Sequence, residues 1–316
     1  MLSSDRIFIA GHLGMVGSAC VRRFQAAACE QLLLRSRAEL DLRDRAAVND
    51  FFAAERPDYV VLAAARVGGI MANSSYPAEF LTENLEIQNN VIWAAYRNGV
   101  KKFCFLGSSC IYPRESPQPI REDYLLTGPL EPSNEGYALA KIAGLKLCAY
   151  LRRQYAFPAF SLMPCNLYGS NDNYHPEHSH VFPALIRKFC TAADQHLPEV
   201  SLWGSGSPWR EFMHVDDLAN AVLFFMQQPD LPPELVNTGA GTETTIKALA
   251  ETIARQAGFQ GKINWDSSKP DGMFRKLLDS SLAQSLGWQA QISLNDGIRQ
   301  TIQEFRQKYL DQSSDC

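Results

Sequence analysis

Residues 6–17 read Arg6-Ile7-Phe8-Ile9-Ala10-Gly11-His12-Leu13-Gly14-Met15-Val16-Gly17, a short apolar run followed at once by three spaced glycines. The apolar run predicts a buried parallel strand, and the residues from Gly14 to about Ala27 predict a helix. A tight turn, close approach of the backbone to a pyrophosphate and close helix-to-strand packing all require glycine at such a turn. The GxxGxxG spacing therefore indicates a dinucleotide site, and the alternative is a glycine-rich turn that holds no ligand.

Strands and helices alternate over the half of the chain that follows. The pattern predicts strands at 31–34, 59–64, 102–107 and 160–163, and helices at 44–55, 77–98 and 135–155. Asp44 is the expected N-cap of the helix at 44–55, and Pro77 is expected to begin the next helix. The alternation implies an α/β fold with a doubly wound parallel Rossmann sheet.

Beyond Pro164 the regular alternation of strands and helices is no longer evident. Helices are expected near 181–193, 216–226, 246–257 and 294–309, with polar, aromatic or glycine-rich segments between them. This half predicts a smaller α/β substrate-binding domain. Because no linker separates the halves, we expect the domains to interleave: the Rossmann domain at 1–165 and about 212–240, and the smaller domain at 166–211 and 241–316.

Composition excludes several classes of protein. The chain is 46% hydrophobic and 20% charged with a net charge of −4, so nothing argues for nucleic-acid binding. Asp5 and Arg6 stand where a signal peptide would need apolar residues, and no apolar run is long enough to span a membrane. The eight cysteines form no Cys-x-x-Cys pair, and the six histidines show no metal-ligand grouping. We expect a cytoplasmic protein without a metal.

The residues after the second expected strand bear on which dinucleotide binds. They are Arg35-Ser36-Arg37, with no acid until Glu39. An acid would suit the ribose diol of NAD, whereas guanidiniums suit the 2′-phosphate of NADP. The sequence favours NADP(H), and the alternative is a solvated basic turn. Asp41 and Leu42 follow, where an adenine edge could be held.

A Tyr-x-x-x-Lys motif, Tyr137 to Lys141, lies in the expected helix 135–155, and Ser108 follows the expected strand 102–107. Residues four apart share a helix face. We expect the Lys141 ammonium to lower the pKa of the Tyr137 phenol, making it a proton donor for a carbonyl that receives a hydride. Alone the motif is weak evidence; after a glycine turn and a serine it is much stronger.

Cys110 lies two residues beyond Ser108. A thiol whose pKa is tuned suits proton transfer at carbon, and the alternative is a small buried hydrophobe.

Together these motifs resemble those of the extended short-chain dehydrogenase/reductases, and within that family those of the GDP-L-fucose synthases. The resemblance runs nearly end to end. It also rests on Ala63–Ile70, Asn166–Gly169, Trp203–Gly206, Arg210–Phe212 and His214–Asp217, and its narrowest motifs are Gly107–Pro113, Asn173–Pro176 and Lys269–Gly272. It implies an NADPH-dependent enzyme that epimerises C3 and C5 of GDP-4-dehydro-6-deoxy-D-mannose and then reduces C4. A homodimer formed through the helices at 77–98 and 135–155 is implied by the resemblance alone.

The resemblance also implies roles for site residues. Tyr137 would give the proton for reduction, Lys141 would hold the nicotinamide ribose, and Ser108 would bind the carbonyl oxygen. Cys110 and His180 would move protons at carbon, and which is base and which is acid stays open. For His180 the alternative is a helix N-terminal residue that only hydrogen-bonds.

Cofactor contacts are implied for Gly11, His12, Leu13, Gly14, Met15, Val16, Gly17, Arg37, Asp41, Leu42, Leu106, Gly107, Ser108, Ser109, Lys141, Pro164, Cys165, Asn166, Leu167 and His180. Substrate contacts are implied for Lys188, Trp203, Arg210 and Asp279: cations for the diphosphate, an indole that stacks and an acceptor for hydroxyls. The alternative for Trp203 is a core aromatic.

One departure from the family pattern concerns the cofactor. Leu13 stands where the family often carries a second basic residue, so the preference for NADP rests mainly on Arg37, with Arg35 nearby. Two other functions compete with the main reading. One is another NAD(P)-dependent sugar-nucleotide 4-epimerase or dehydratase, against which Cys110 counts. The other is a non-catalytic dinucleotide-binding regulator, which would usually lack the tyrosine or the lysine.

Overall fold

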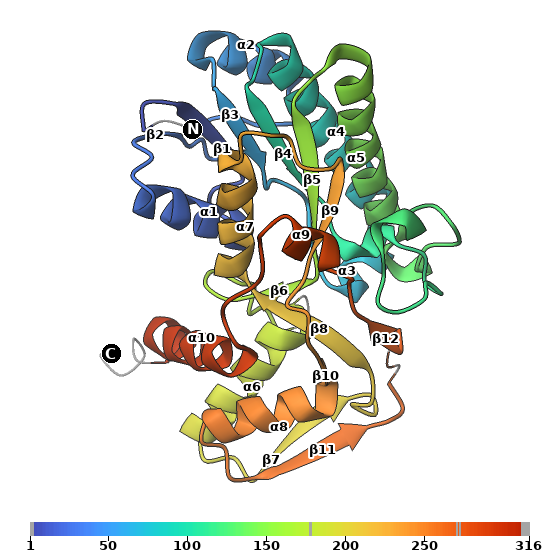
Figure 1. Ribbon diagram of the computed structural model, residues 1–316. Coiled ribbons are helices and arrows are strands. Elements are labelled where there is room, and N and C mark those ends of the chain that lie inside the picture. Colours follow the sequence, from blue (N-terminus) through green and yellow to red (C-terminus); the bar gives the residue numbers. More distant parts are fainter. Residues whose placement is uncertain (1–2, 177–178, 270, 272, 311–316) are drawn as a thin grey trace.

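The computed structural model describes residues 3–176, 179–269, 271 and 273–310; Pro270 and Gly272 of the Lys269–Gly272 motif lie outside these ranges. A six-stranded sheet in the order β2-β1-β3-β4-β5-β9 forms its upper part (Figure 1). All neighbouring strands in it are parallel. The strands are β1 Arg6–Ala10, β2 Gln31–Leu33, β3 Tyr59–Leu62, β4 Lys102–Leu106, β5 Ala159–Pro164 and β9 Leu235–Thr238. The expected α/β fold with a parallel Rossmann sheet is confirmed.

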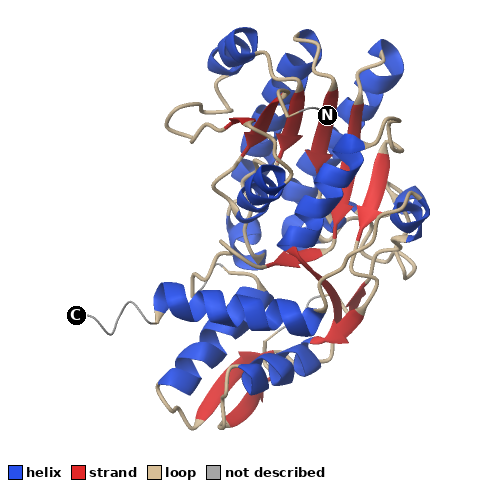
Figure 2. Ribbon diagram, turned by 60° about the vertical axis from the view of Figure 1, so that its left-hand side comes forward, coloured by secondary structure: helices blue, strands red, loops and turns tan. Residues whose placement is uncertain are grey.

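Helices cover both faces of this sheet (Figures 1 and 2). On one face α1 (Met15–Ala26) packs against α7 (Val215–Gln227), and on the other α4 (Pro77–Arg97) packs between α2 (Arg45–Glu55) and α5 (Glu135–Tyr155). Every residue of β3, β4 and β5 is buried, as expected for strands covered on both sides.

The helix caps follow the sequence pattern closely. The Asp44 carboxylate accepts hydrogen bonds from the backbone N–H groups of Ala46 and Ala47, at 2.9 and 3.1 Å, so the predicted cap of α2 is confirmed. Asp216 and Asp217 lie inside the first turn of α7. The cap there is the His214 imidazole, which accepts from the Asp216 N–H at 3.2 Å.

The lower part of the molecule is built on a second hydrophobic cluster, which includes Tyr168, Phe182, Phe189, Leu249 and Ile298. Its helices are α6 (Val181–Asp194), α8 (Ile246–Gln256) and α10 (Leu294–Tyr309), and its outer strands β7 (Glu199–Trp203) and β11 (Lys262–Asp266) pair in parallel (Figure 2). Strand β8 (Trp209–His214) lies between β10 (Glu243–Thr245) and β12 (Arg275–Lys276), and also pairs with β6 (Asn166–Tyr168), which follows β5.

Short elements complete the chain: α3 (Ile70–Ser75), α9 (Ser281–Ser285) and the 3-10 turns η1 (Ser109–Ile111), η2 (Glu122–Tyr124) and η3 (Pro132–Asn134). Among the described residues, no helix is both long enough and apolar enough to cross a membrane.

Candidate active site

The glycine turn joins β1 to α1 at the carboxyl edge of the sheet. Gly11 has a φ of +84°, and a Cβ there would lie 2.8 Å from the backbone of Ala64; a Cβ on Gly17 would collide with the Gly11 carbonyl. Gly14 is the N-cap of α1 and provides no side-chain cap for the first N–H groups of that helix. The order of the sheet reverses at β1, where open α/β sheets bind ligands. This turn fits a dinucleotide pyrophosphate.

The two arginines after β2 differ in their surroundings. The Arg35 guanidinium is paired with Glu55 at 2.7 Å and lies over the Phe51 ring. The Arg37 side chain is 70% exposed, and its Nε lies 3.9 Å from the Asp41 carboxylate. Arg37 is thus the better placed of the two for a phosphate.

Asp41 itself is held by Arg43, which the sequence analysis does not single out. Hydrogen bonds from that guanidinium, the shortest 2.6 Å, lower the pKa of the Asp41 carboxyl to about 2. Asn90 of α4 donates to the backbone carbonyls of Leu42 and Arg43, at 3.0 and 2.9 Å, and so fixes this loop. In the glycine turn itself, the Leu13 side chain is 70% exposed.

The predicted pair Tyr137 and Lys141 lies on the first turns of α5, facing the end of β4. The Lys141 ammonium is buried, donates a hydrogen bond to the Leu106 carbonyl at 2.8 Å and lies 5.8 Å from the centre of the Tyr137 ring. Phe80 of α4 packs edge-on against the same ring. The helix thus presents both side chains to the carboxyl end of β4.

The expected lowering of the Tyr137 pKa is wrong for this structure. Burial raises the pKa of the Tyr137 phenol, and the charge of Cys110 adds to the rise. Burial also lowers the pKa of the Lys141 ammonium to about 8. Desolvation is the largest cause of both shifts, because burial disfavours the charged form of the phenol and of the ammonium alike.

Ser108 is the N-cap residue of η1, and Cys110 lies within that turn, shortly after β4. The Ser108 hydroxyl accepts from the backbone N–H of Cys110 at 3.4 Å and also hydrogen-bonds its thiol. Burial raises the pKa of this thiol, and the charges of Lys276 and Lys141 oppose the rise. Ser108, Cys110, Tyr137 and Lys141 therefore form one interacting group, which we call the catalytic cluster.

The remaining predicted cofactor residues of the sheet lie near the same edge. Leu106, Gly107 and Ser109 flank Ser108 at the end of β4, and Pro164, Cys165, Asn166 and Leu167 run from the end of β5 into β6. The backbone of Cys165 bonds to Thr238 of β9, and the Asn166 amide donates to the Glu211 carbonyl of β8 at 2.8 Å. His12, Met15 and Val16 belong to the glycine turn and the start of α1.

The predicted substrate residues belong to elements of the lower part. Trp203 ends β7 with 65% of its surface exposed, which excludes the alternative of a core aromatic. The Asp271 carboxylate accepts from the N–H and the hydroxyl of Ser205, each at 2.7 Å, and so fixes the turn after Trp203. The Lys269 ammonium lies 5.5 Å above the indole.

The three polar substrate residues each have a local backbone contact. Lys188 of α6 donates to the Ser201 carbonyl at 2.8 Å, and Arg210 of β8 donates to the Trp209 carbonyl at 2.7 Å. Burial lowers the pKa of both groups. Asp279 follows β12, and its carboxylate accepts from the Ser281 N–H at 2.9 Å. Hydrogen bonds from the Ser281 side chain and backbone lower the pKa of the Asp279 carboxyl.

His180 is the N-cap residue of α6, but its ring makes no capping hydrogen bond. Its side chain is exposed on one side, and desolvation by the surrounding protein lowers the pKa of the imidazole. No hydrogen bond among the described residues joins it to Cys110. The structure thus assembles the catalytic cluster directly and carries His180 and the substrate residues on other elements.

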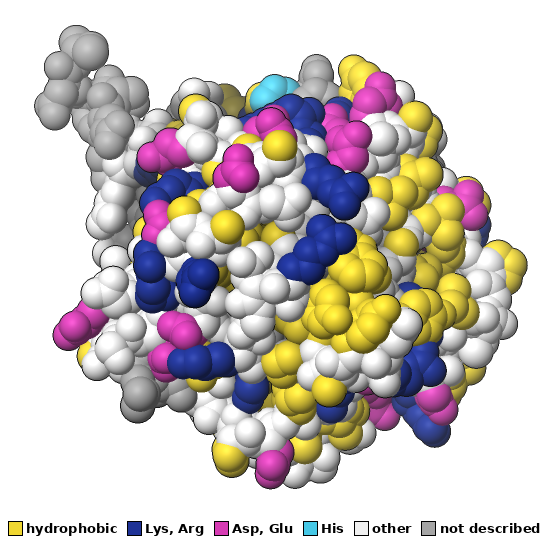
Figure 3. Space-filling model, turned by 90° about the horizontal axis from the view of Figure 1, so that it is seen from above, with side chains coloured by type: hydrophobic (Ala, Val, Ile, Leu, Met, Phe, Trp, Pro, Cys, Tyr) yellow, Lys and Arg dark blue, Asp and Glu magenta, His cyan; other side chains and the backbone are white. Residues whose placement is uncertain are grey.

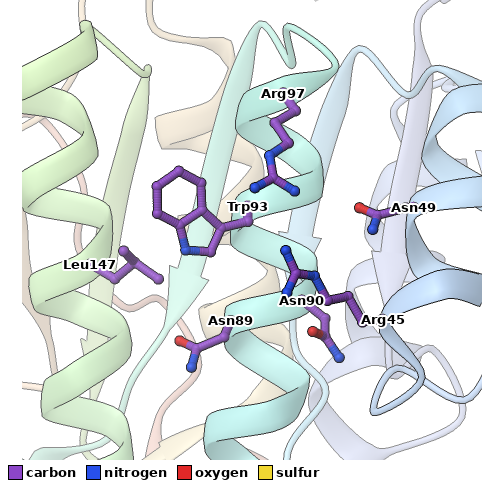
Figure 4. A pocket seen from close by; sticks show the side chains of 7 residues that line it. All are labelled: Arg45, Asn49, Asn89, Asn90, Trp93, Arg97 and Leu147. Atoms are coloured by element: carbon purple, nitrogen blue, oxygen red, sulfur yellow. The ribbon is translucent and has the colours of Figure 1, made fainter.

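A pocket of about 430 Å³ lies elsewhere, between α2, α4 and α5 (Figure 4). It is lined by Arg45, Asn49, Asn89, Asn90, Trp93, Arg97 and Leu147, none of which is a predicted site residue. The chemistry of the catalytic cluster therefore does not depend on it.

Two charged residues near the site were not singled out from the sequence. Glu211 is fully buried in β8, and Lys276 is half-buried in β12. The signal for Glu211 is its place within the Arg210–Phe212 motif, and the signal for Lys276 is its position three residues before Asp279.

Comparisons with known proteins show the family of the chain. Residues 7–239 match the NAD dependent epimerase/dehydratase family. A putative GDP-L-fucose synthase 2 of Arabidopsis thaliana is 58% identical over 300 residues, 95% of this chain and 91% of that protein. The GDP-L-fucose synthase of Escherichia coli (strain K12) is 52% identical, covering 96% of this chain and 97% of that protein. A solved GDP-mannoheptose C4 reductase from Campylobacter jejuni with NADP bound superposes with a TM-score of 0.90 at 36% identity, covering 97% and 99% of the two chains.

Proposed function

Because this chain belongs to the NAD dependent epimerase/dehydratase family, and within it to the GDP-L-fucose synthases, we infer that it makes GDP-L-fucose from GDP-4-dehydro-6-deoxy-D-mannose. It is an NADP-dependent enzyme that epimerises C3 and C5 and reduces C4. Identity of 52–58% with two GDP-L-fucose synthases over nearly their whole lengths carries this conclusion. The bound cofactor supplies the hydride, and the residues below supply the protons and the binding.

We propose that Tyr137 and Ser108 serve the C4 oxygen. Ser108 donates a hydrogen bond to it, and Tyr137 gives the proton when C4 is reduced. The raised pKa of the Tyr137 phenol keeps it protonated, as a proton donor requires. The ammonium of Lys141, held at the Leu106 carbonyl, supplies positive charge beside the phenol as it loses its proton.

Cys110 and His180 are proposed to move protons at C3 and C5. The carbonyl at C4 acidifies both positions, so one group removes a proton and another returns one to the opposite face. Cys110 lies within the catalytic cluster, and the lowered pKa of His180 leaves its imidazole neutral near pH 7, able to accept a proton.

Recognition of the nucleotide sugar is assigned to the lower part. Lys188 and Arg210 would bind the diphosphate, the exposed indole of Trp203 would stack on a ring, and Asp279 would accept from hydroxyls. The two hydrophobic clusters support a division into a Rossmann domain and a smaller substrate-binding domain, but Leu278, Ala283 and Trp288, from the segment predicted for the smaller domain, belong to the cluster of the Rossmann sheet.

The test is product identification after incubation with GDP-4-dehydro-6-deoxy-D-mannose and NADPH. One NADPH should be oxidised for each GDP-L-fucose formed. Interconversion of C4 epimers without net NADPH consumption would instead indicate a 4-epimerase.

Variants should separate the two halves of the reaction. In deuterated water, Tyr137→Phe should still place deuterium at C3 or C5 while oxidising almost no NADPH. Cys110→Ser and His180→Gln should suppress deuterium uptake by about 10²–10⁴-fold while still binding NADPH. Deuterium uptake at the wild-type rate in both variants would contradict the epimerase roles.

A homodimer formed through α4 and α5 is also proposed. Leu139, Ala143 and Tyr150 line one exposed face of α5, at helical spacing. Figure 3 shows the molecule from above. Hydrophobic side chains gather toward its right-hand side, which is the side on which α4 and α5 lie in Figure 1. We further propose a cytoplasmic location, which the free and buried state of the seven described cysteines supports.

A further inference from the structure

One face of α4 carries three buried side chains, each four residues from the next: Phe80, Asn84 and Gln88, all 2% exposed. The Phe80 ring packs edge-on against the Tyr137 ring, with 6.4 Å between the ring centres. Asn84 donates to the Phe80 carbonyl at 2.7 Å. A buried carboxamide such as that of Gln88 is costly unless it makes hydrogen bonds, so its hydrogen-bond partner indicates its role.

The Gln88 carboxamide contacts the turn of α5 that carries the Tyr137–Lys141 pair. Its amide donates to the Ala140 carbonyl at 2.7 Å, and both residues are buried. Ala140 immediately precedes Lys141 and lies three residues after Tyr137. In a regular helix a carbonyl already accepts from the N–H four residues further on, so the bond from Gln88 is an additional one. It therefore fixes where this turn of α5 lies against α4.

Gly144, one turn further along α5, makes room for Gln88. A Cβ on Gly144 would lie 2.6 Å from the Gln88 side-chain oxygen and 2.6 Å from the Phe105 ring of β4. Glycine inside a helix costs about 1 kcal/mol relative to alanine, and here it allows this close approach. The Phe105 ring lies 5.0 Å from the Lys141 ammonium, which donates to the neighbouring Leu106 carbonyl at 2.8 Å. The contacts of Gln88 and Lys141 thus converge between α4, α5 and β4.

We propose that Gln88 is a positioning residue for the reduction of C4, whose hydrogen bond holds the Tyr137–Lys141 turn in place beside β4. The inference rests on the proposed role of Tyr137 as the proton donor. In that step the C4 oxygen takes the phenol proton as C4 gains the hydride from NADPH, and the phenolate is left beside the Lys141 ammonium. Cys110 and His180 lie on η1 and at the start of α6, so epimerisation does not depend on this contact.

The test uses Gln88→Met, which keeps the length of the side chain but removes its hydrogen-bond donor. Because a misplacement of about 1 Å can cost about 10²-fold in rate, the kcat for NADPH oxidation should fall by about 10- to 100-fold. The KM for the sugar nucleotide and the deuterium uptake at C3 and C5 should stay close to their wild-type values. Asn98→Ala is the matched control, since Asn98 of the same helix boundary also donates to a helix carbonyl, that of Ala94, at 2.9 Å. It should leave both reactions unchanged.

Gly144→Ala, which places a methyl group against the Gln88 oxygen and the Phe105 ring, is a second variant and should lower reduction in the same selective way. A wild-type rate of reduction in either variant would overturn the proposal. Equal losses of reduction and deuterium uptake would also overturn it, because they would show general damage to the fold. NADPH oxidation at the wild-type rate in Tyr137→Phe would instead overturn the role of Tyr137 itself, and with it any positioning by Gln88.

Discussion

Arg35 and Arg37 carry the same charge and lie two residues apart, but their side chains have different surroundings. Arg35 is bound to Glu55 and packed on Phe51, so its guanidinium serves the fold. Arg37 extends into solvent, and its Nε lies 3.9 Å from the Asp41 carboxylate. Since Leu13 supplies no charge in the glycine turn, we predict that selection of the 2′-phosphate depends on Arg37.

Replacing Arg37 by alanine should therefore raise the KM for NADPH by at least about tenfold and leave that for NADH nearly unchanged. Loss of one charge-assisted contact to the phosphate costs about 1.5–3 kcal/mol. Steady-state kinetics with both cofactors measure this. Arg35→Ala is the matched control, which should lower stability without changing the ratio of the two KM values; equal changes for both cofactors in Arg37→Ala would contradict the assignment.

At the scale of the element, strand β8 carries one buried carboxylate, that of Glu211, which binds two segments that lie far from β8 in the chain. Glu211 accepts from the Gly241 N–H at 2.8 Å and from the Leu278 N–H at 3.0 Å. Complete burial raises the pKa of its carboxyl to about 7, although these hydrogen bonds oppose the rise. Glu211 thus holds the chain just before Asp279 at the expense of a desolvated carboxyl group.

Because the pKa of Glu211 is raised in the native state, the free energy of unfolding should depend on pH in a definite direction. Between about 4.5, the ordinary pKa, and about 7, native Glu211 holds a proton that the unfolded chain has released. The free energy of unfolding should therefore fall as pH rises through that window, by on the order of 3 kcal/mol.

Urea unfolding at several pH values, compared between the wild type and Glu211→Gln, measures this slope. The glutamine variant will be less stable overall, because its amide N–H₂ replaces one acceptor, but it should lose this part of the pH dependence. Identical slopes in the two proteins would show that Glu211 is ionised throughout.

At the scale of the whole molecule, the two long helices α4 and α5 leave apolar side chains at the surface. Tyr150 is exposed on α5, and Tyr155 near the end of that helix stacks on Tyr96 of α4 at 5.0 Å. The proposed homodimer would bury this face far from the glycine turn, so each subunit would keep a complete catalytic cluster.

A charge in this face should separate the subunits. Tyr150→Glu should weaken self-association by at least about tenfold, since burying an unpaired carboxylate is unfavourable and aromatic residues dominate such contacts. Sedimentation velocity over a range of concentrations measures it. Leu197→Glu, at an exposed leucine after α6, is the control and should leave the dimer intact. A wild-type protein that sediments as a monomer would contradict the proposal.

The sequence by itself determined the elements whose signals are local. The buried strands β1, β3 and β4 and the helices α2, α4 and α5 lie within about two residues of their predicted ends, because hydrophobic period, Asp44 and Pro77 act over a few residues. The glycine turn and the Tyr137–Lys141 pair were predicted for the same reason, because both motifs are recognised from the spacing of a few residues along the chain.

Tertiary structure alone decided the rest. Strands β8, β10 and β12 contain two to six residues, and their partners lie more than 30 residues away in the chain. No local sequence pattern therefore predicts them. The pKa directions of Tyr137 and Lys141 depend on burial, which is set by packing of α5 against β4 and α4. Electrostatic influence depends on distance in space and on desolvation, and neither is encoded in the spacing of residues along the chain.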